Sequence, residues 1–176
     1  YYDAFVLSKA KNYDVSVKEG VITINGDFDY GISDKVEKIL KKDKTIEFVV
    51  LNSDGGLLYE AKKLSKIILL NSLNTHTNDG CRSACTIAYI SGNTRYIYKE
   101  ADLGFHQYSI ARPNARVDKL TLLDLLHDQQ EDAKFFQKRG ASETFTDQMY
   151  KYDADGMWYP PIYDLKRYGV VHEILE

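Results

Sequence analysis

The chain has 176 residues, of which 44% are hydrophobic and three are prolines, so we expect one compact domain, residues 1–176, with a sizeable core. A formal net charge of −3 and a pI near 5.8 argue against binding of nucleic acid or of an anionic membrane surface. No apolar run approaches the ~20 residues that a membrane-spanning helix requires, so no membrane span is expected in this chain.

The first elements expected along the chain are a β-hairpin and a short helix. Residues 14–17 and 21–24 each alternate apolar and polar side chains, and a turn that contains a glycine separates them. Asp34 and Glu37 have the spacing of a capping box, which predicts a helix that opens at Asp34 and ends at Lys41.

Strands and helices are then expected to alternate through the middle of the chain. Residues 45–51 are apolar on both faces, as in a central parallel strand. Apolar residues at helical spacing predict a helix over 57–71, and a further helix at 83–92 lies between expected strands at 74–77 and 95–98. This alternation predicts stacked βαβ units and an α/β fold.

The last third of the chain is expected to contain a long helix. A polar loop is predicted at 110–116, followed by an amphipathic helix over 117–139 that ends at Gly140. The proline pair at 160–161 predicts the start of a last short helix, and a final strand is expected from Val170. We find no repeat and no linker, which supports a single domain.

Three segments contain the residues of a possible site for acyl transfer. The segment 80–86, of sequence GCRSACT, places Ser83 at the start of a helix, while His106 ends an apolar strand and Gly55 and Gly56 follow the central strand. A serine hydroxyl needs a nearby base, and the oxyanion that forms needs two preorganised donors. Glycine leaves the backbone open to an approaching carbonyl, and a helix N-terminus favours negative charge. These residues therefore indicate a nucleophile, a base and backbone donors.

The same segments resemble the ClpP family of serine peptidases. The resemblance is carried, in consistent order, by residues 50–56 (VLNSDGG), 80–86 and 103–107 (LGFHQ), and it extends over roughly residues 45 to 175 to the closing 168–171 (YGVV). The most similar group within the family is the one of ClpP-like proteins exported to the periplasm, whose members also carry a Cys-x-Ser-Ala-Cys-Thr segment.

The resemblance implies a fold, an activity and a set of site residues. The fold is the ClpP/crotonase-type spiral of ββα units, with a long helix after the histidine. The activity is cleavage of peptide bonds through an acyl-enzyme, without metal or organic cofactor, with Ser83 as nucleophile and His106 as base. The Gly56 and Ala84 N–H groups would form the oxyanion hole. The helix 117–139 matches the segment that packs ClpP subunits into rings, so a homo-oligomer that acts on peptides or proteins is expected, with or without an ATPase partner.

The third member of the catalytic triad is the point of departure from the family. Counting forward from His106 leads to Asp155, whereas counting back from Tyr168 places Met157 at the acidic position. Asp155 is favoured over Asp153, and the absence of any acid is a further alternative. Without an acid the tautomer of the imidazole is not fixed, and the reaction is slower by orders of magnitude.

Simpler explanations exist for each of these residues, and two other functions remain open. Ser83 is also a suitable helix N-cap, His106 a suitable buried histidine, and Asp155 a suitable solvated turn residue. One alternative function is a catalytically weak ClpP-like module that binds a peptide or partner in its cleft, which Met157 favours. The other is a crotonase-type acyl-CoA enzyme, which would not need Ser83 or His106.

The two cysteines of the chain, Cys81 and Cys85, flank Ser83. They could form a disulfide that braces this turn, remain buried thiols, or bind zinc with His76, although Cys-x₃-Cys lacks a second pair of ligands. The cysteine pair and the resemblance predict an exported, periplasmic protein. The chain opens at Tyr1 without a leader, so we expect a processed form from which a signal peptide has been removed.

Overall fold

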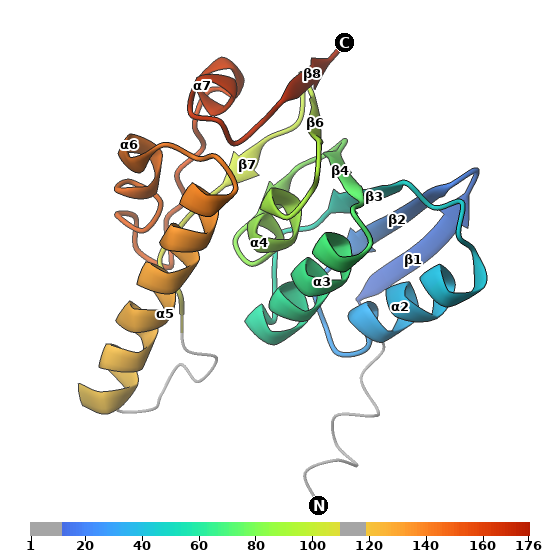
Figure 1. Ribbon diagram of the computed structural model, residues 1–176. Helices are drawn as coiled ribbons and strands as arrows, with labels where there is room; N and C mark the ends of the chain where they lie inside the picture. Colours follow the sequence, from blue (N-terminus) through green and yellow to red (C-terminus); the bar gives the residue numbers. More distant parts are fainter. Residues whose placement is uncertain (1–11, 110–118) are drawn as a thin grey trace, which may run out of the picture.

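A computed structural model describes residues 12–109 and 119–176 of the chain, and strands and helices alternate along it (Figure 1). The strands are β1 (Tyr13–Lys18), β2 (Val21–Gly26), β3 (Phe48–Asn52), β4 (Asn74–Thr77), β5 (Cys81–Arg82), β6 (Arg95–Tyr98), β7 (Leu103–Gly104) and β8 (Glu173–Leu175). The helices are α2 (Ile32–Lys42), α3 (Leu58–Leu70), α4 (Cys85–Ile90), α5 (Lys119–Lys138), α6 (Glu143–Thr146) and α7 (Ile162–Arg167).

Within residues 12–109 and 119–176, the main sheet has six strands in the order β1-β2-β3-β4-β6-β8. Strands β1 and β2 form the predicted antiparallel hairpin, and every other neighbouring pair is parallel. The two-residue turn of the hairpin consists of Glu19 and Gly20, with φ of 48° and 78°, the left-handed geometry that matches the twist of the strands. The predicted α/β class is confirmed.

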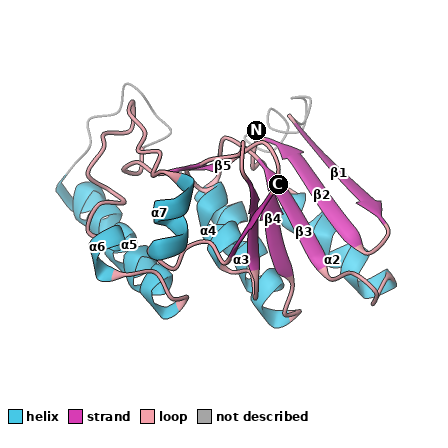
Figure 2. Cartoon of the chain, turned by 90° about the horizontal axis from the view of Figure 1, so that it is seen from above, coloured by secondary structure: helices cyan, strands magenta, loops and turns pink. Residues whose placement is uncertain are grey.

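Helices α2, α3 and α4 cover one face of this sheet (Figure 2). Their apolar residues, such as Val36 and Leu64, are fully buried, as are Ile22, Val49 and Ile97 on the strands. Strands β2, β4 and β6 alternate between buried and partly exposed residues, because successive side chains of a strand point to opposite faces. The core therefore lies between the sheet and these three helices.

A second, smaller layer holds the segments that follow the main strands. Strand β5 pairs in parallel with β7, and isolated bridges join Ser53 to Cys81, Phe28 to Gly56 and Phe105 to Trp158. The segments that leave β3, β4 and β6 therefore meet in one place, although they are far apart in the sequence. This layer was not foreseen, because strands of two residues leave no periodic pattern in a sequence.

Helices α5, α6 and α7 form a further group beside α4, on the left in Figure 1. The rings of Phe105, Phe136, Phe145 and Trp158 pack together here, with centroids 5.0–6.1 Å apart. The C-terminal half of α5 is anchored by buried residues such as Phe136. Its first half has four exposed leucines, Leu120, Leu122, Leu123 and Leu126.

The start of α2 differs from the prediction. Gly31 is the N-cap, without a capping side chain, and Asp34 lies in the first turn, where it pairs with Lys63. The N–H groups of Gly31 and Ser33 instead donate to the buried carboxylate of Glu60, at 3.2 and 3.0 Å. A carboxylate from another helix thus replaces the predicted capping box, a tertiary contact that local spacing does not reveal.

The final strand also begins later than predicted. Val170 and Val171 are buried but not in a strand, because both N–H groups donate to the Leu165 carbonyl at the end of α7. The Val170 carbonyl accepts a hydrogen bond from Arg95 Nε at 2.7 Å. The backbone is therefore engaged until β8 begins at Glu173. The predicted loop 110–116 and the first residues of the predicted helix 117–139 lie outside the described residues.

Candidate active site

Ser83 lies on a tight turn between β5 and α4. Its φ is 53°, a left-handed conformation that is uncommon for a residue with a Cβ atom. The Ser83 N–H donates to the Gly104 carbonyl at 2.8 Å, and the Thr86 N–H donates to the Ser83 carbonyl at 3.0 Å. The N-cap of α4 is Ala84, and no side chain in the described part of the chain caps the helix, so the Ser83 hydroxyl does not act as the cap.

The Ser83 hydroxyl instead meets the imidazole of His106. The distance between Ser83 Oγ and His106 Nε2 is 2.8 Å, which is hydrogen-bonding distance. His106 is two residues beyond β7, and its neighbour Phe105 exchanges two backbone hydrogen bonds with Trp158, at 2.8 and 3.0 Å. The structure therefore brings together the two residues that the sequence assigned as nucleophile and base.

The other nitrogen of His106 has no hydrogen-bond partner among the described residues. Nδ1 is buried, and no hydrogen-bonding group of the described residues reaches it. Asp153 and Asp155 are exposed, on a turn closed by a hydrogen bond from the Gly156 N–H to the Asp153 carbonyl at 2.9 Å. The expected pairing of Asp155 with His106 is therefore not present in this structure. The turn projects its carboxylates toward solvent.

Met157 takes the space next to the strand that leads to His106. A Cβ atom built on Gly104 would lie 2.2 Å from the Met157 sulfur, so the thioether packs directly against this glycine. A thioether is at most a weak hydrogen-bond acceptor and cannot replace a carboxylate.

Of the two expected oxyanion donors, Ala84 directly follows the serine in the chain, and Gly56 directly follows Gly55, which packs against the serine. Gly55 has φ of 112°, and a Cβ atom built on it would lie 2.8 Å from Ser83 Cβ and 3.2 Å from the Ala84 nitrogen. Gly56 has φ of 136° and is pressed against Phe28. Within the described part of the chain, no acceptor is bound to the N–H of either Gly56 or Ala84. Neither N–H group is thus committed to another group of the described chain.

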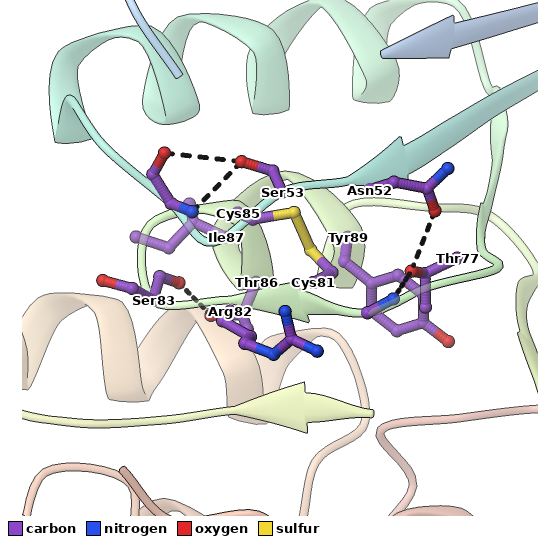
Figure 3. Close-up of a disulfide and its surroundings, with 12 residues drawn as sticks. Asn52, Ser53, Thr77, Cys81, Arg82, Ser83, Cys85, Thr86, Ile87 and Tyr89 are labelled. Carbon is purple, nitrogen blue, oxygen red and sulfur yellow. Dashed lines mark hydrogen bonds between the residues drawn. A yellow bond between two sulfur atoms is a disulfide. The ribbon is translucent and has the colours of Figure 1, made fainter. Parts of the chain in front are cut away.

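Cys81 and Cys85 form a disulfide across the turn, with their Cα atoms 5.4 Å apart (Figure 3). Both residues are fully buried. Because both sulfurs are bonded to each other, neither can be a thiolate ligand, and the zinc site considered with His76 is not formed. In the described ranges, no cluster of three or more potential metal ligands exists.

Arg82 is a residue of this site that the sequence analysis missed. Its guanidinium binds Asp102 through two hydrogen bonds, of 2.7 and 3.0 Å, and Asp54 through one of 2.5 Å. The hydrogen bonds to Asp102, and then the one to Asp54, raise the pKa of Arg82 above its usual value. Arg82, the residue before Ser83, thus links this turn to the loops that precede Gly55 and β7. The signal in the sequence that could have identified Arg82 is its position next to Ser83.

A small cavity of about 10 Å³ adjoins Ser83 and His106 and is bordered by Tyr108 and Tyr150. The two tyrosine hydroxyls are 2.9 Å apart, and the Tyr108 hydroxyl donates to the carboxylate of Asp132. Burial raises the pKa of Asp132, although Lys62 lies 3.3 Å from its carboxylate. This buried network links α5 to the segment after β7 that carries His106.

Comparison with known proteins identifies the fold but not a family. No family model matches the sequence, and no curated protein matches it. Among solved structures, a single-substitution mutant of ClpP1 from Listeria monocytogenes superimposes with a TM-score of 0.70 at 17% identity, over 89% of this chain and 91% of that chain. ClpP1 from the same organism gives 0.68 at 18% identity, over the same shares. The chain therefore has a ClpP-type α/β fold, which confirms the predicted fold class.

The described helices include none that is both long and apolar enough to cross a membrane.

Proposed function

We propose that this chain is a ClpP-like serine hydrolase that cleaves peptide bonds through an acyl-enzyme. The observation that carries the proposal is the 2.8 Å contact between Ser83 Oγ and His106 Nε2, at a serine held in a left-handed turn. Strained turns of this kind expose a nucleophile, and a hydroxyl needs a base at this distance. The ClpP-type fold supports the choice of peptides as substrates.

In the proposed reaction, His106 Nε2 takes the proton of the Ser83 hydroxyl while Oγ attacks the carbonyl carbon of the substrate. The carbonyl oxygen becomes an oxyanion, which the Gly56 and Ala84 N–H groups would stabilise. His106 then returns the proton to the leaving amine as the peptide bond breaks, which leaves an ester on Ser83. A water molecule, activated by the same imidazole, hydrolyses this ester. No metal or organic cofactor takes part in these steps.

The unpaired Nδ1 of His106 predicts a slow enzyme. To accept the serine proton at Nε2, the neutral ring must carry its hydrogen on Nδ1, and a carboxylate partner normally fixes that tautomer. Loss of this partner costs roughly 10⁴-fold in rate where the effect has been measured. Asp155 as the partner stays a proposal that requires the turn 153–156 to move.

Hydrolysis of a fluorescently labelled unfolded protein, such as casein, tests this function. The wild-type chain should release labelled peptides, and Ser83→Ala should not. Asp155→Asn distinguishes a site in which Asp155 orients His106 from a site without an acid. The substitution slows only an enzyme of the first kind. No turnover by the folded wild type at any concentration would count against a peptidase.

The unpaired imidazole nitrogen also favours a second candidate, a ClpP-like module that binds a peptide or partner without turning it over. Such a module would bind unfolded protein equally well before and after Ser83→Ala. A crotonase-type acyl-CoA enzyme is the third and weaker candidate, since it gives no role to the contact between Ser83 and His106. Calorimetry with CoA tests it, and absence of binding dismisses it.

Assembly and export belong to the same proposal. The exposed leucines in the first half of α5 form an apolar strip that a second copy of the chain would cover, as expected for a homo-oligomer. The disulfide supports an oxidising compartment such as the periplasm. Alkylation and mass measurement of protein taken from its native compartment test export, and two free thiols there would contradict it.

A further inference from the structure

The disulfide closes a ring of five residues that contains the proposed nucleophile. Cys81 belongs to β5 and Cys85 is the first residue of α4, so Ser83 is at the centre of the ring and Ala84 is next to it (Figure 3). The proposed nucleophile and one proposed oxyanion donor are therefore held within one covalent loop.

The two halves of this ring are anchored in different ways. On the incoming side, the N–H groups of Cys81, Arg82 and Ser83 donate to the Asp102, Ser53 and Gly104 carbonyls, at 2.8–3.0 Å. On the outgoing side, the Ala84 N–H has no acceptor within the described residues, and no side chain caps α4. The Thr86 N–H and hydroxyl donate to the Ser83 carbonyl, at 3.0 and 2.7 Å, and the disulfide adds a covalent link between the outgoing half and the anchored incoming half.

We propose that the Cys81–Cys85 disulfide is a positioning element of the active site, and that its reduction lowers the rate of chemistry at Ser83. The inference rests on the proposed hydrolase function. Ser83 has a disfavoured φ, which persists only where the surroundings enforce it. Without the disulfide, the turn relaxes, and both Ser83 Oγ and the Ala84 N–H leave their places. Small displacements of reacting groups can cost about 10²-fold in rate.

The reduction is a thiol–disulfide exchange with a dithiol. The disulfide takes two electrons and two protons from a dithiol such as dithiothreitol, which gives the Cys81 and Cys85 thiols and leaves the dithiol as a cyclic disulfide. Both cysteines are fully buried, so the exchange requires local opening of the turn and should be slow in the folded protein.

The first test compares the oxidised wild type with Cys81→Ser/Cys85→Ser in their reaction with a fluorophosphonate probe. The maximal rate of modification should fall tenfold or more in the variant, with a smaller change in the half-saturating probe concentration. Val36→Ala is the control, because it removes buried volume from α2, away from the turn, and should keep the wild-type rate while the protein is folded. A double variant that reacts within twofold of the wild type overturns the proposal.

The second test uses the wild type alone, so it does not depend on folding of the variant. After partial reduction and alkylation, the lost fraction of labelling should equal the fraction of opened disulfide found by mass spectrometry. Reduced protein that labels at the oxidised rate contradicts the proposal. Hydrogen exchange over residues 83–90 gives a readout without activity, and exchange that is unchanged by reduction also overturns the inference. Failure of the oxidised wild type to label, by contrast, counts against the hydrolase function itself.

Discussion

At the scale of single residues, the candidate site depends on backbone that only glycine can form. A Cβ atom on Gly55 would meet both the serine and the Ala84 nitrogen, and the left-handed φ of this residue disfavours any side chain. The chemistry of Ser83 is thus linked to a residue that takes no part in bond making. This link can be tested without touching the serine or the histidine.

Gly55→Ala should lower the rate of fluorophosphonate labelling at least tenfold, because the added methyl group would lie 2.8 Å from Ser83 Cβ and displace it. Gly20→Ala is a matched control at another left-handed glycine, in the hairpin turn, where the nearest neighbour is the Thr45 carbonyl oxygen. Each substitution should cost about 1 kcal/mol of stability or more, but the control should label at the wild-type rate. Equal labelling of the two variants would contradict the assigned geometry.

His76 gives a prediction about pH. Its Nε2 is buried without a partner in the described residues, and burial lowers the pKa of His76 below 6.5. The unfolded chain therefore binds the proton more tightly than the folded protein. The stability supported by the neutral ring is complete above pH 6.5 and is lost as the pH falls from 6.5 toward the lowered value.

Urea unfolding at about pH 7 and about pH 5 measures this dependence. His76→Phe should reduce the loss of stability on acidification, because no proton can bind there. His127→Gln, at an exposed position on α5, should leave that loss unchanged. If His76→Phe loses as much stability on acidification as the wild type, the dependence belongs to other groups. Among them is His172, whose pKa is also lowered by burial.

At the scale of elements, Arg95 joins the ends of three helices. Its side chain is 1% exposed and donates to the carbonyls of Gly92, Arg139, Gly169 and Val170, which follow α4, α5 and α7. Helix ends leave carbonyls without partners, and one guanidinium satisfies several of them here. Burial lowers the pKa of Arg95 to about 10, so the group stays charged near neutral pH.

Arg95→Leu should reduce the free energy of unfolding by about 3 kcal/mol or more, because it leaves several buried carbonyls unpaired. Thermal or urea unfolding measures the change. Arg167→Leu is the control, since Arg167 is 79% exposed and its pairing with Asp164 is a surface contact worth little. A loss of less than about 1 kcal/mol at Arg95 would mean that the helix ends find other partners.

Sequence periodicity predicted the long elements well, because a buried face leaves a pattern. The strands 74–77 and 95–98 have the predicted bounds, and α3 and the described part of α5 lie where they were expected. Contacts between distant segments leave no such pattern. The Glu60 carboxylate at the start of α2 and the paired short strands β5 and β7 are of this kind.

In the candidate site, too, the residues themselves were predicted from the sequence, whereas their contacts with distant segments were not. Ser83, His106 and the glycine pair were identified because their types are compatible with acyl transfer, and because the resemblance placed them in a known pattern. Sequence spacing does not decide whether Asp155 or Met157 is at the acidic position. The surroundings of His106 Nδ1 depend instead on how the turn 153–156 packs. Arg82 was missed because an arginine forms ion pairs in many settings, and its partners are distant in the sequence.

At the scale of the whole molecule, the fold leaves the apolar residues in the first half of α5 exposed. Leu120, Leu122, Leu123 and Leu126 are 46–72% exposed, whereas the second half of α5 is anchored to the rest of the chain. An apolar strip of this kind is costly in water and is usually covered in an assembly. The exposed strip is therefore the surface on which the proposed oligomer depends.

Leu123→Asp should lower the mass of the particle in sedimentation or light scattering, because a carboxylate would be buried at the contact. Gln130→Asp is the matched control, since it adds the same charge at an exposed position in the second half of the same helix. A monomeric wild type, or equal masses for the two variants, would contradict assembly through this strip.

The central claim is that His106 activates Ser83 as a nucleophile. Time-resolved labelling by a fluorophosphonate probe, with the adduct located by peptide mass mapping, tests it most directly. The account predicts one adduct, on Ser83, that is absent in Ser83→Ala and forms about 10²-fold more slowly or worse in His106→Ala. A folded wild type without an adduct, or one that labels equally fast without His106, would contradict it.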